Sequence, residues 1–272
     1  MFKAFHCRRR PLLLIPVIVA IFFLFPFGRG GHSRSILGLL LLVLPPSAAL
    51  AAYLIATAAA LFSIGLHNTS ERDAALLKWQ NGCDPSGLPA LCAKQTADLS
   101  DLRREAGYCL DLRAVRAVAF CELGQWSDAA SALTVLDSYL PPQPCGAAVA
   151  AHLARCALAV HRKDPRKAQA ALEQAETLLS QGVTPPGWLA APYLTALYRQ
   201  ALALDLNCGS PPGPAVLERN LSEAFGCRER VLAHWALARE ALRWGRDAQI
   251  HLDYVARHGG KLWFRPQTQP VG

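Results

Sequence analysis

The first 66 residues of the chain contain no Asp or Glu, and this absence constrains the fold more than any other feature of the sequence. Two long apolar runs in this segment, residues 11–27 and 36–66, have no charged side chain. A helix over the shorter run is about 26 Å long, which approaches the roughly 30 Å of a bilayer's hydrocarbon core. We therefore expect two transmembrane helices, with residues 28–35 as the link between them.

Prolines modify both predicted spans. Pro45 and Pro46 are expected to kink the second run, and residues 47–66 still suffice to cross a bilayer. A cleaved signal peptide is the alternative for the first run, but its apolar stretch exceeds the usual length of about 7 to 15 residues and no small-x-small cleavage site follows it. A single span is the other alternative to a helical hairpin.

Basic residues in the flanks predict the orientation, because cytoplasmic flanks carry an excess of Lys and Arg. With two spans, the N-terminal flank of residues 1–10 and the segment after the second span lie on the same side. They carry six basic residues against two in the link: Lys3, Arg8, Arg9, Arg10, Arg72 and Lys78 against Arg29 and Arg34. We therefore expect an integral membrane protein with both termini in the cytoplasm.

The net charge of +8 and the pI of about 9.2 belong to the N-terminal end, since residues 67–272 carry 22 basic and 20 acidic side chains. A basic tail is not a basic face, so the charge does not predict nucleic-acid binding. The nine cysteines form no C-x-x-C pair, and several fall within helical patterns, as buried thiols do. We expect them to be reduced, with a Cys83–Cys92 bridge as the alternative in an oxidising environment.

Beyond residue 67 the apolar residues recur at intervals of three and four, which predicts an all-α domain. Three proline-rich segments, residues 141–144, 185–187 and 211–214, are expected to end helices. Helix pairs are expected between these loops.

Residues 122–141, ELGQWSDAASALTVLDSYLP, contain the clearest helix-turn-helix pattern. Gly124 permits a tight turn, Trp126 is expected to pack over it, and Ala129 lets two helices approach closely. Pro141 ends the second helix. The pattern resembles the second half of a tetratricopeptide repeat, a helix pair of about 34 residues.

Two weaker units follow. In residues 149–182, Asp164 is expected to cap the second helix and Pro165 to begin it. Ala168 is the small residue of this unit. In residues 228–260, Ala248 is the small residue, Leu252 and Val255 are expected to face inward, and Gly259 ends the helix.

The end of the chain carries a second resemblance. Residues 254–263, YVARHGGKLW, are similar to the tail of bacterial membrane proteins that have two N-terminal spans and degenerate helical repeats. This resemblance implies the bacterial plasma membrane as the location and brings no assigned chemistry. The expected fold is a transmembrane hairpin followed by a degenerate tetratricopeptide-like α-solenoid, in this order: basic flank 1–10, spans 11–27 and 36–66, linker and first helices 67–109, repeat domain 110–262 and tail 263–272.

Motifs for catalysis or cofactor binding are not found, so the sequence predicts no enzyme, no cofactor and no metal. His251 and His258 are seven residues apart and share a helix face, but no Cys or carboxylate completes a ligand set. The apolar runs contain no ionisable group of the kind that transport requires, which favours an anchor. A membrane enzyme with a helical accessory domain remains a less favoured alternative.

The predicted partner is a protein or peptide, because helix-pair repeats bind extended segments on a concave face formed by the first helices. Four basic or potentially basic side chains are placed there and favour an acidic segment or a chain carboxylate: Arg113, Arg116, His152 and Arg155. Solvated helix faces are the competing interpretation. The basic run over residues 162–167 is interpreted as a solvated loop or as a contact with anionic lipid headgroups. We expect a membrane-anchored adaptor or scaffold, with a structural subunit of a membrane complex as the alternative.

Overall fold

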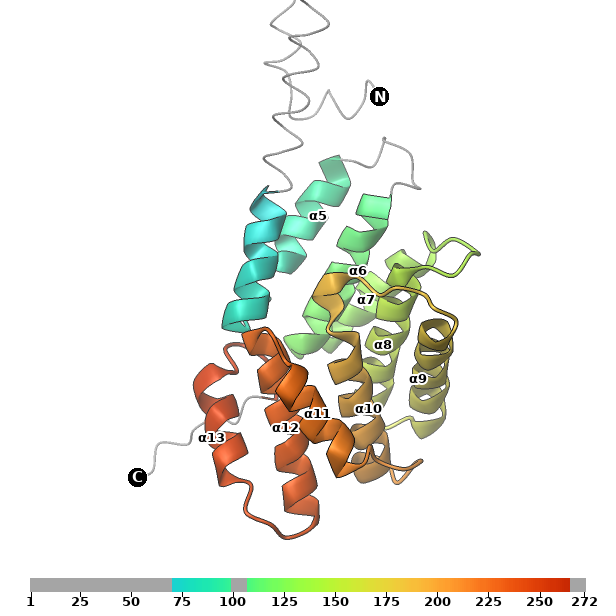
Figure 1. Ribbon diagram of the computed structural model, residues 1–272. Coiled ribbons are helices and arrows are strands. Elements are labelled where there is room, and N and C mark those ends of the chain that lie inside the picture. Colours follow the sequence, from blue (N-terminus) through green and yellow to red (C-terminus); the bar gives the residue numbers. More distant parts are fainter. Residues whose placement is uncertain (1–69, 99–106, 265–272) are drawn as a thin grey trace, which may run out of the picture. The chain divides into compact units, whose positions relative to one another are not determined.

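The computed structural model describes residues 70–98 and 107–264 (Figure 1). The described residues from Arg72 onward belong to one compact unit. The predicted membrane spans lie outside the described residues. No helix among those that are described is long and apolar enough to cross a bilayer.

All regular structure in the described part of the chain is helical, which confirms the all-α prediction. A helix covers residues 70–82 and leads into the numbered elements. These are α5 (Leu88–Asp98), α6 (Gly107–Glu122), α7 (Trp126–Asp137), α8 (Gly146–His161), α9 (Pro165–Ser180), the 3-10 turn η1 (Gly187–Leu189), α10 (Ala191–Asp205), α11 (Pro214–Glu223), α12 (Cys227–Arg243) and α13 (Gln249–His258).

The turn between α6 and α7 has the expected glycine at its centre. Gly124 has φ +70, and the amide of Gln125 donates to the carbonyl of Phe120 at 2.9 Å, the hydrogen bond that closes a Schellman cap. A Cβ at Gly124 would lie 2.9 Å from the Cβ of Trp263. Glycine is therefore required both by the positive φ and by the close approach of Trp263. Ala129 is fully buried where α7 meets α6, as the sequence predicts.

The turn between α8 and α9 repeats this geometry without a glycine. Asp164 caps α9, since its Oδ1 accepts from the amide of Lys167 at 3.1 Å, and Pro165 is the first residue of the helix. The left-handed position is occupied by Lys163, with φ 55, and the amide of Asp164 donates to the carbonyl of Ala159 at 2.9 Å. The predicted cap and helix start are therefore confirmed.

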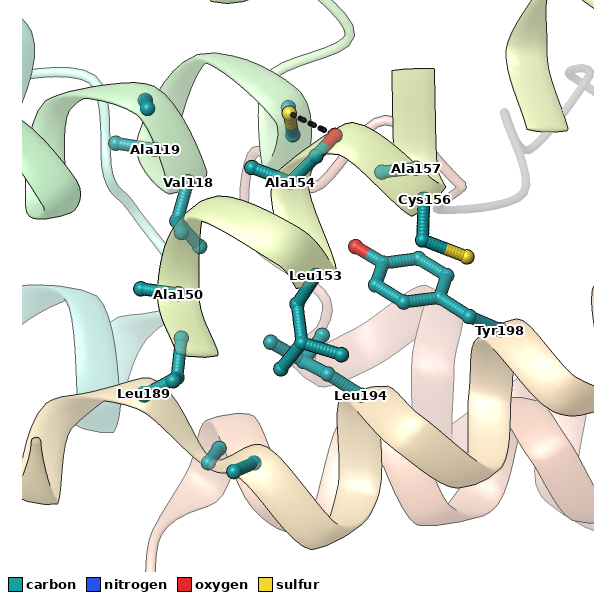
Figure 2. Packing of buried hydrophobic residues seen from close by; sticks show 14 of the residues in the cluster. Val118, Ala119, Ala150, Leu153, Ala154, Cys156, Ala157, Leu189, Leu194 and Tyr198 are labelled. Atoms are coloured by element: carbon teal, nitrogen blue, oxygen red, sulfur yellow. Dashed lines mark hydrogen bonds between the residues drawn. The ribbon is translucent and has the colours of Figure 1, made fainter. Parts of the chain in front are cut away.

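The first helices of successive pairs pack on one another: α6 on α8, α8 on α10, and α10 on α12 (Figure 1). The second helices α7, α9 and α13 pack against their own partners, whereas α11 packs mainly against α12 of the following pair. In Figure 2, Leu153 of α8 lies beside Leu194 of α10, with Val118 of α6 on the other side of α8. Alanines fill the remaining contacts, and Ala119 and Ala150 are fully buried, so the helices approach closely.

The last helix pair meets the predictions in part. Ala248 and Val255 are buried, but Ala248 is the N-cap of α13 and Leu252, expected to face inward, is half-buried. The helix ends at His258 with Gly259 as its cap, and the left-handed residue is the next one, Gly260, with φ 53. Between the predicted units lie η1, α10 and α11, where the sequence assigned no unit of its own.

The end of the described chain returns to its beginning. The amide of Trp263 donates to the carbonyl of Glu122 at 2.8 Å, and that of Lys261 donates to the carbonyl of Cys83 at 2.9 Å. In an open solenoid each repeat contacts its neighbours alone, so these contacts tie the last pair back to the first helices. Trp79, in the segment expected to hold a linker and first helices, is fully buried in the shared core.

Candidate functional site

The four predicted partner-binding residues lie on α6 and α8, which pack against each other, and each is half-buried. The guanidinium of Arg113 lies 3.7 Å from the ring centroid of Tyr139, just after α7. That of Arg155 pairs with Asp137, the last residue of α7, and lies 3.1 Å from Nδ1 of His152. Arg113 and Arg155 therefore reach the C-terminal end of α7, and His152 lies beside Arg155. We call Arg113, Asp137, Tyr139, His152 and Arg155 the α7-end cluster.

Arg116 lies apart from this cluster. Its guanidinium is 5.5 Å from the ring centroid of Phe120, and its positive charge acts on the thiol of Cys92 in α5. The prediction of one groove lined by four residues thus corresponds, in the structure, to three residues at one place and a fourth that faces α5.

His152 differs electrostatically from its neighbours. Burial lowers its pKa, the charge of Arg155 lowers it further, and Asp137 acts in the opposite direction. Because the ordinary histidine pKa of about 6.5 is already below neutrality, His152 is uncharged at pH 7. The α7-end cluster then has two cations and one anion, with a neutral imidazole that accepts or donates a hydrogen bond.

Two of the predicted side chains have buried N–H groups with no hydrogen-bond partner in the part of the chain that the structure describes. They are Nη1 of Arg113 and Nε of Arg116. A buried donor without a partner costs roughly 1 to 3 kcal/mol. The accessible part of a guanidinium group favours a carboxylate, which it binds through paired, charge-assisted hydrogen bonds.

The most buried ion pair of the described residues was not anticipated from the sequence. Glu122, at the end of α6, and Arg228, in the first turn of α12, form an ion pair in which the side chains are 3% and 1% exposed. Nε of Arg228 donates to both carboxylate oxygens of Glu122 at 3.1 and 3.0 Å. Nε1 of Trp79 donates to the same carboxylate at 2.7 Å, and Nη1 of Arg228 donates to the carbonyl of Trp188 at 2.8 Å.

This buried centre connects elements that are far apart in the sequence. The guanidinium of Arg228 lies 4.1 Å from the ring centroid of Trp79, and that ring is 5.8 Å from the ring of Trp188. Both carboxylate oxygens of Glu122 accept hydrogen bonds from the protein, so neither is available to a reaction. We assign the centre a structural role.

The histidines that share a face of α13 have a third neighbour on α12. Nδ1 of His251 lies 2.8 Å from Nδ1 of His234, and the ring of Tyr254 is stacked on His234 and lies against His258, with centroid distances of 4.0 and 4.5 Å. The described residues include no group of three or more His, Cys, Asp or Glu placed to hold a metal ion. We interpret the contact between His234 and His251 as a hydrogen bond between two neutral imidazoles.

The remaining predicted features are on the surface or are buried thiols. Arg162, Lys163, Arg166 and Lys167 are exposed around the turn between α8 and α9, and the ammonium of Lys167 pairs with Asp164 at 3.1 Å. Cys83 and Cys92, the alternative disulfide, are both free and buried.

Searches of protein-family models, curated proteins and solved structures found no match to the chain.

Proposed function

We propose that the chain is a membrane-anchored, tetratricopeptide-like adaptor whose helical domain binds an acidic protein segment or a chain carboxylate at the α7-end cluster. The observation that carries the proposal is that the α7-end cluster holds two half-buried guanidinium groups, those of Arg113 and Arg155, and the single carboxylate of Asp137, which leaves a net positive charge for an acidic ligand. The guanidinium of Arg113 lies over Tyr139, which orients its fork. The order in which α6, α8 and α10 pack on one another supports a helix-pair repeat.

A competing interpretation has a physical basis in the same geometry. The C-terminus of a helix carries partial negative charge, so Arg113 and Arg155 would stabilise the end of α7 without any partner. Under that interpretation, reversing both charges lowers the stability of the domain. The amount of partner recovered with the folded variant is then the same as with the unmodified chain.

Crosslinking in native membranes followed by affinity recovery distinguishes the two. We expect a partner in stoichiometric amount with the unmodified chain and its loss with the double variant Arg113→Glu, Arg155→Glu. Arg199→Glu is the matched control, because Arg199 also pairs with a carboxylate across helices, that of Glu176, away from the α7-end cluster. Unchanged recovery with the folded double variant would rule out this site.

The membrane anchor is tested separately, since the predicted spans at residues 11–27 and 36–66 lie outside the described residues. A reporter that is active in the periplasm should be inactive when fused after Gly272 and active when fused between Gly28 and Ser35. Strong activity at the C-terminus would contradict the cytoplasmic hairpin. Recovery of a fixed set of membrane subunits, lost when any one of them is missing, would favour the structural-subunit alternative.

A further inference from the structure

Two cysteines that are far apart in the sequence lie in segments that pack against each other where α12 begins. Cys83 directly follows the helix over residues 70–82 and is fully buried, whereas Cys227 is the first residue of α12 and half-buried. The residues beside them are in contact, because a Cβ at Gly226 would lie 3.6 Å from the carbonyl oxygen of Gln80 and the guanidinium of Arg228 lies 4.1 Å from the ring centroid of Trp79. Both cysteines are free in the structure.

The backbone after α13 holds the two cysteines in place. The amide of Lys261 donates to the carbonyl of Cys83 at 2.9 Å, and Sγ of Cys227 lies 4.0 Å from the carbonyl oxygen of His258. Gly260 permits this approach, because its φ is 53 and a Cβ there would lie 2.5 Å from the carbonyl oxygen of Cys83. One short segment thus contacts both cysteines.

The environments of the two thiols differ in a way that assigns them different roles. Burial raises the pKa of Cys83, and the neighbouring Cys227 and Glu122 raise it further, so Cys83 is protonated at neutral pH. Cys227 is the more exposed of the two and is the thiol that a dissolved reagent meets first.

We propose that Cys83 and Cys227 form a reversible disulfide that ties the helix over residues 70–82 to the start of α12. The oxidant is a small disulfide such as oxidised glutathione. The Cys227 thiolate attacks one of its sulfurs, which breaks the S–S bond, releases one glutathione thiolate and leaves a mixed disulfide. Cys83 then loses its proton to water and attacks the Cys227 sulfur, releasing the second glutathione. Two protein thiols are oxidised and one disulfide is reduced.

The position of the bridge gives it a structural consequence. Trp79 lies one helical turn before Cys83, and Arg228 directly follows Cys227, so the bridge would connect the two segments that hold Glu122. A crosslink between distant residues stabilises a fold by restricting its unfolded state. Oxidation should therefore strengthen the junction between the first and last helices.

The test uses the purified full chain in detergent, incubated with oxidised glutathione, quenched with N-ethylmaleimide and digested with trypsin. Cleavage after Lys78, Lys94, Arg219 and Arg228 yields peptides 79–94 and 220–228, and we expect them joined by a disulfide. The melting temperature should rise on oxidation, return with dithiothreitol and stay constant in Cys227→Ser. Circular dichroism confirms that this variant is folded.

Peptide 79–94 also contains Cys92, which provides a matched control. Cys92→Ala should keep the joined peptides, and Cys83→Ala should lose them. If the folded chain gave glutathione adducts or a Cys83–Cys92 bridge without the joined peptides, the proposal would be wrong.

Discussion

Glu122 and Arg228 are 106 residues apart in the sequence and form an ion pair that is almost completely shielded from water. Their partners come from two further segments, the indole of Trp79 before α5 and the carbonyl of Trp188 in η1. Burying two charges is costly and is repaid where the geometry is good and every remaining donor and acceptor is satisfied. The donors and acceptors are satisfied only when four separate segments come together. The ion pair therefore specifies how the first helices of the domain pack against the last ones.

Removing one member of this pair should cost far more than removing one member of an exposed pair. Glu122→Gln leaves the Arg228 charge buried beside a neutral amide, and we expect a loss of about 3 to 5 kcal/mol in the free energy of unfolding measured with urea. Asp253→Asn is the control, because its pair with Arg257 is exposed and 4.0 Å long, and it should cost less than about 1 kcal/mol. Similar small losses in both variants would contradict a structural role for the buried pair.

Local features of the fold were predictable from the sequence. Gly124 and Asp164 interact with residues close to them in the sequence. A short stretch of sequence is therefore enough to predict the turn at Gly124 and the helix cap at Asp164. The pairing of Glu122 with Arg228 is different, since each residue belongs to a helix where a charged side chain is expected to face water. Nothing within either window indicates that the two helices meet.

The candidate site shows the same division. Spacing alone placed Arg113 and Arg116 on one helix, but three residues correspond to nearly one turn, and the two side chains diverge toward Tyr139 and Cys92. The partner of Arg155 is Asp137, at the end of the neighbouring helix α7. Such contacts depend on the packing of helices, which periodicity does not specify.

Enlarging Ala129 should overpack the contact between α7 and α6. The residue is fully buried, so Ala129→Leu forces side chains out of their preferred rotamers, and we expect a loss of about 1 to 3 kcal/mol in the free energy of unfolding. The nearby Gln125 is exposed, and Gln125→Lys should be within about 0.5 kcal/mol of the unmodified chain. An Ala129→Leu variant as stable as this control would show that the two helices are not closely packed.

The turn between α8 and α9 offers a stabilising substitution. Lys163 has φ 55, a left-handed conformation that costs a residue with a Cβ about 1 kcal/mol and that glycine adopts freely. Lys163→Gly should therefore raise the melting temperature. Arg162 has φ −77, so Arg162→Gly relieves no backbone strain. It adds conformational freedom to the unfolded chain and should therefore lower the melting temperature. A decrease in both variants would refute the left-handed conformation of Lys163.

The histidine contact between α12 and α13 should make the domain sensitive to mild acid. Burial, followed by the charges of His251 and His258, lowers the pKa of His234 to about 4. An unfolded histidine has a pKa of about 6.5, so between these values the unfolded state binds a proton that the folded state does not. The contribution of His234 to the free energy of unfolding should be fully present above about pH 6.5 and should decrease as the pH is lowered toward 4.

His234→Phe tests this pH dependence, because phenylalanine preserves the stack on Tyr254 and does not titrate. We expect its melting temperature to change less between pH 7 and pH 5 than that of the unmodified chain. Tyr254→Phe, which keeps both histidines and the stacked ring, should retain the original slope. Burial also lowers the pKa of His251, so some slope should persist in His234→Phe. An unchanged slope in His234→Phe would assign the acid sensitivity to other groups.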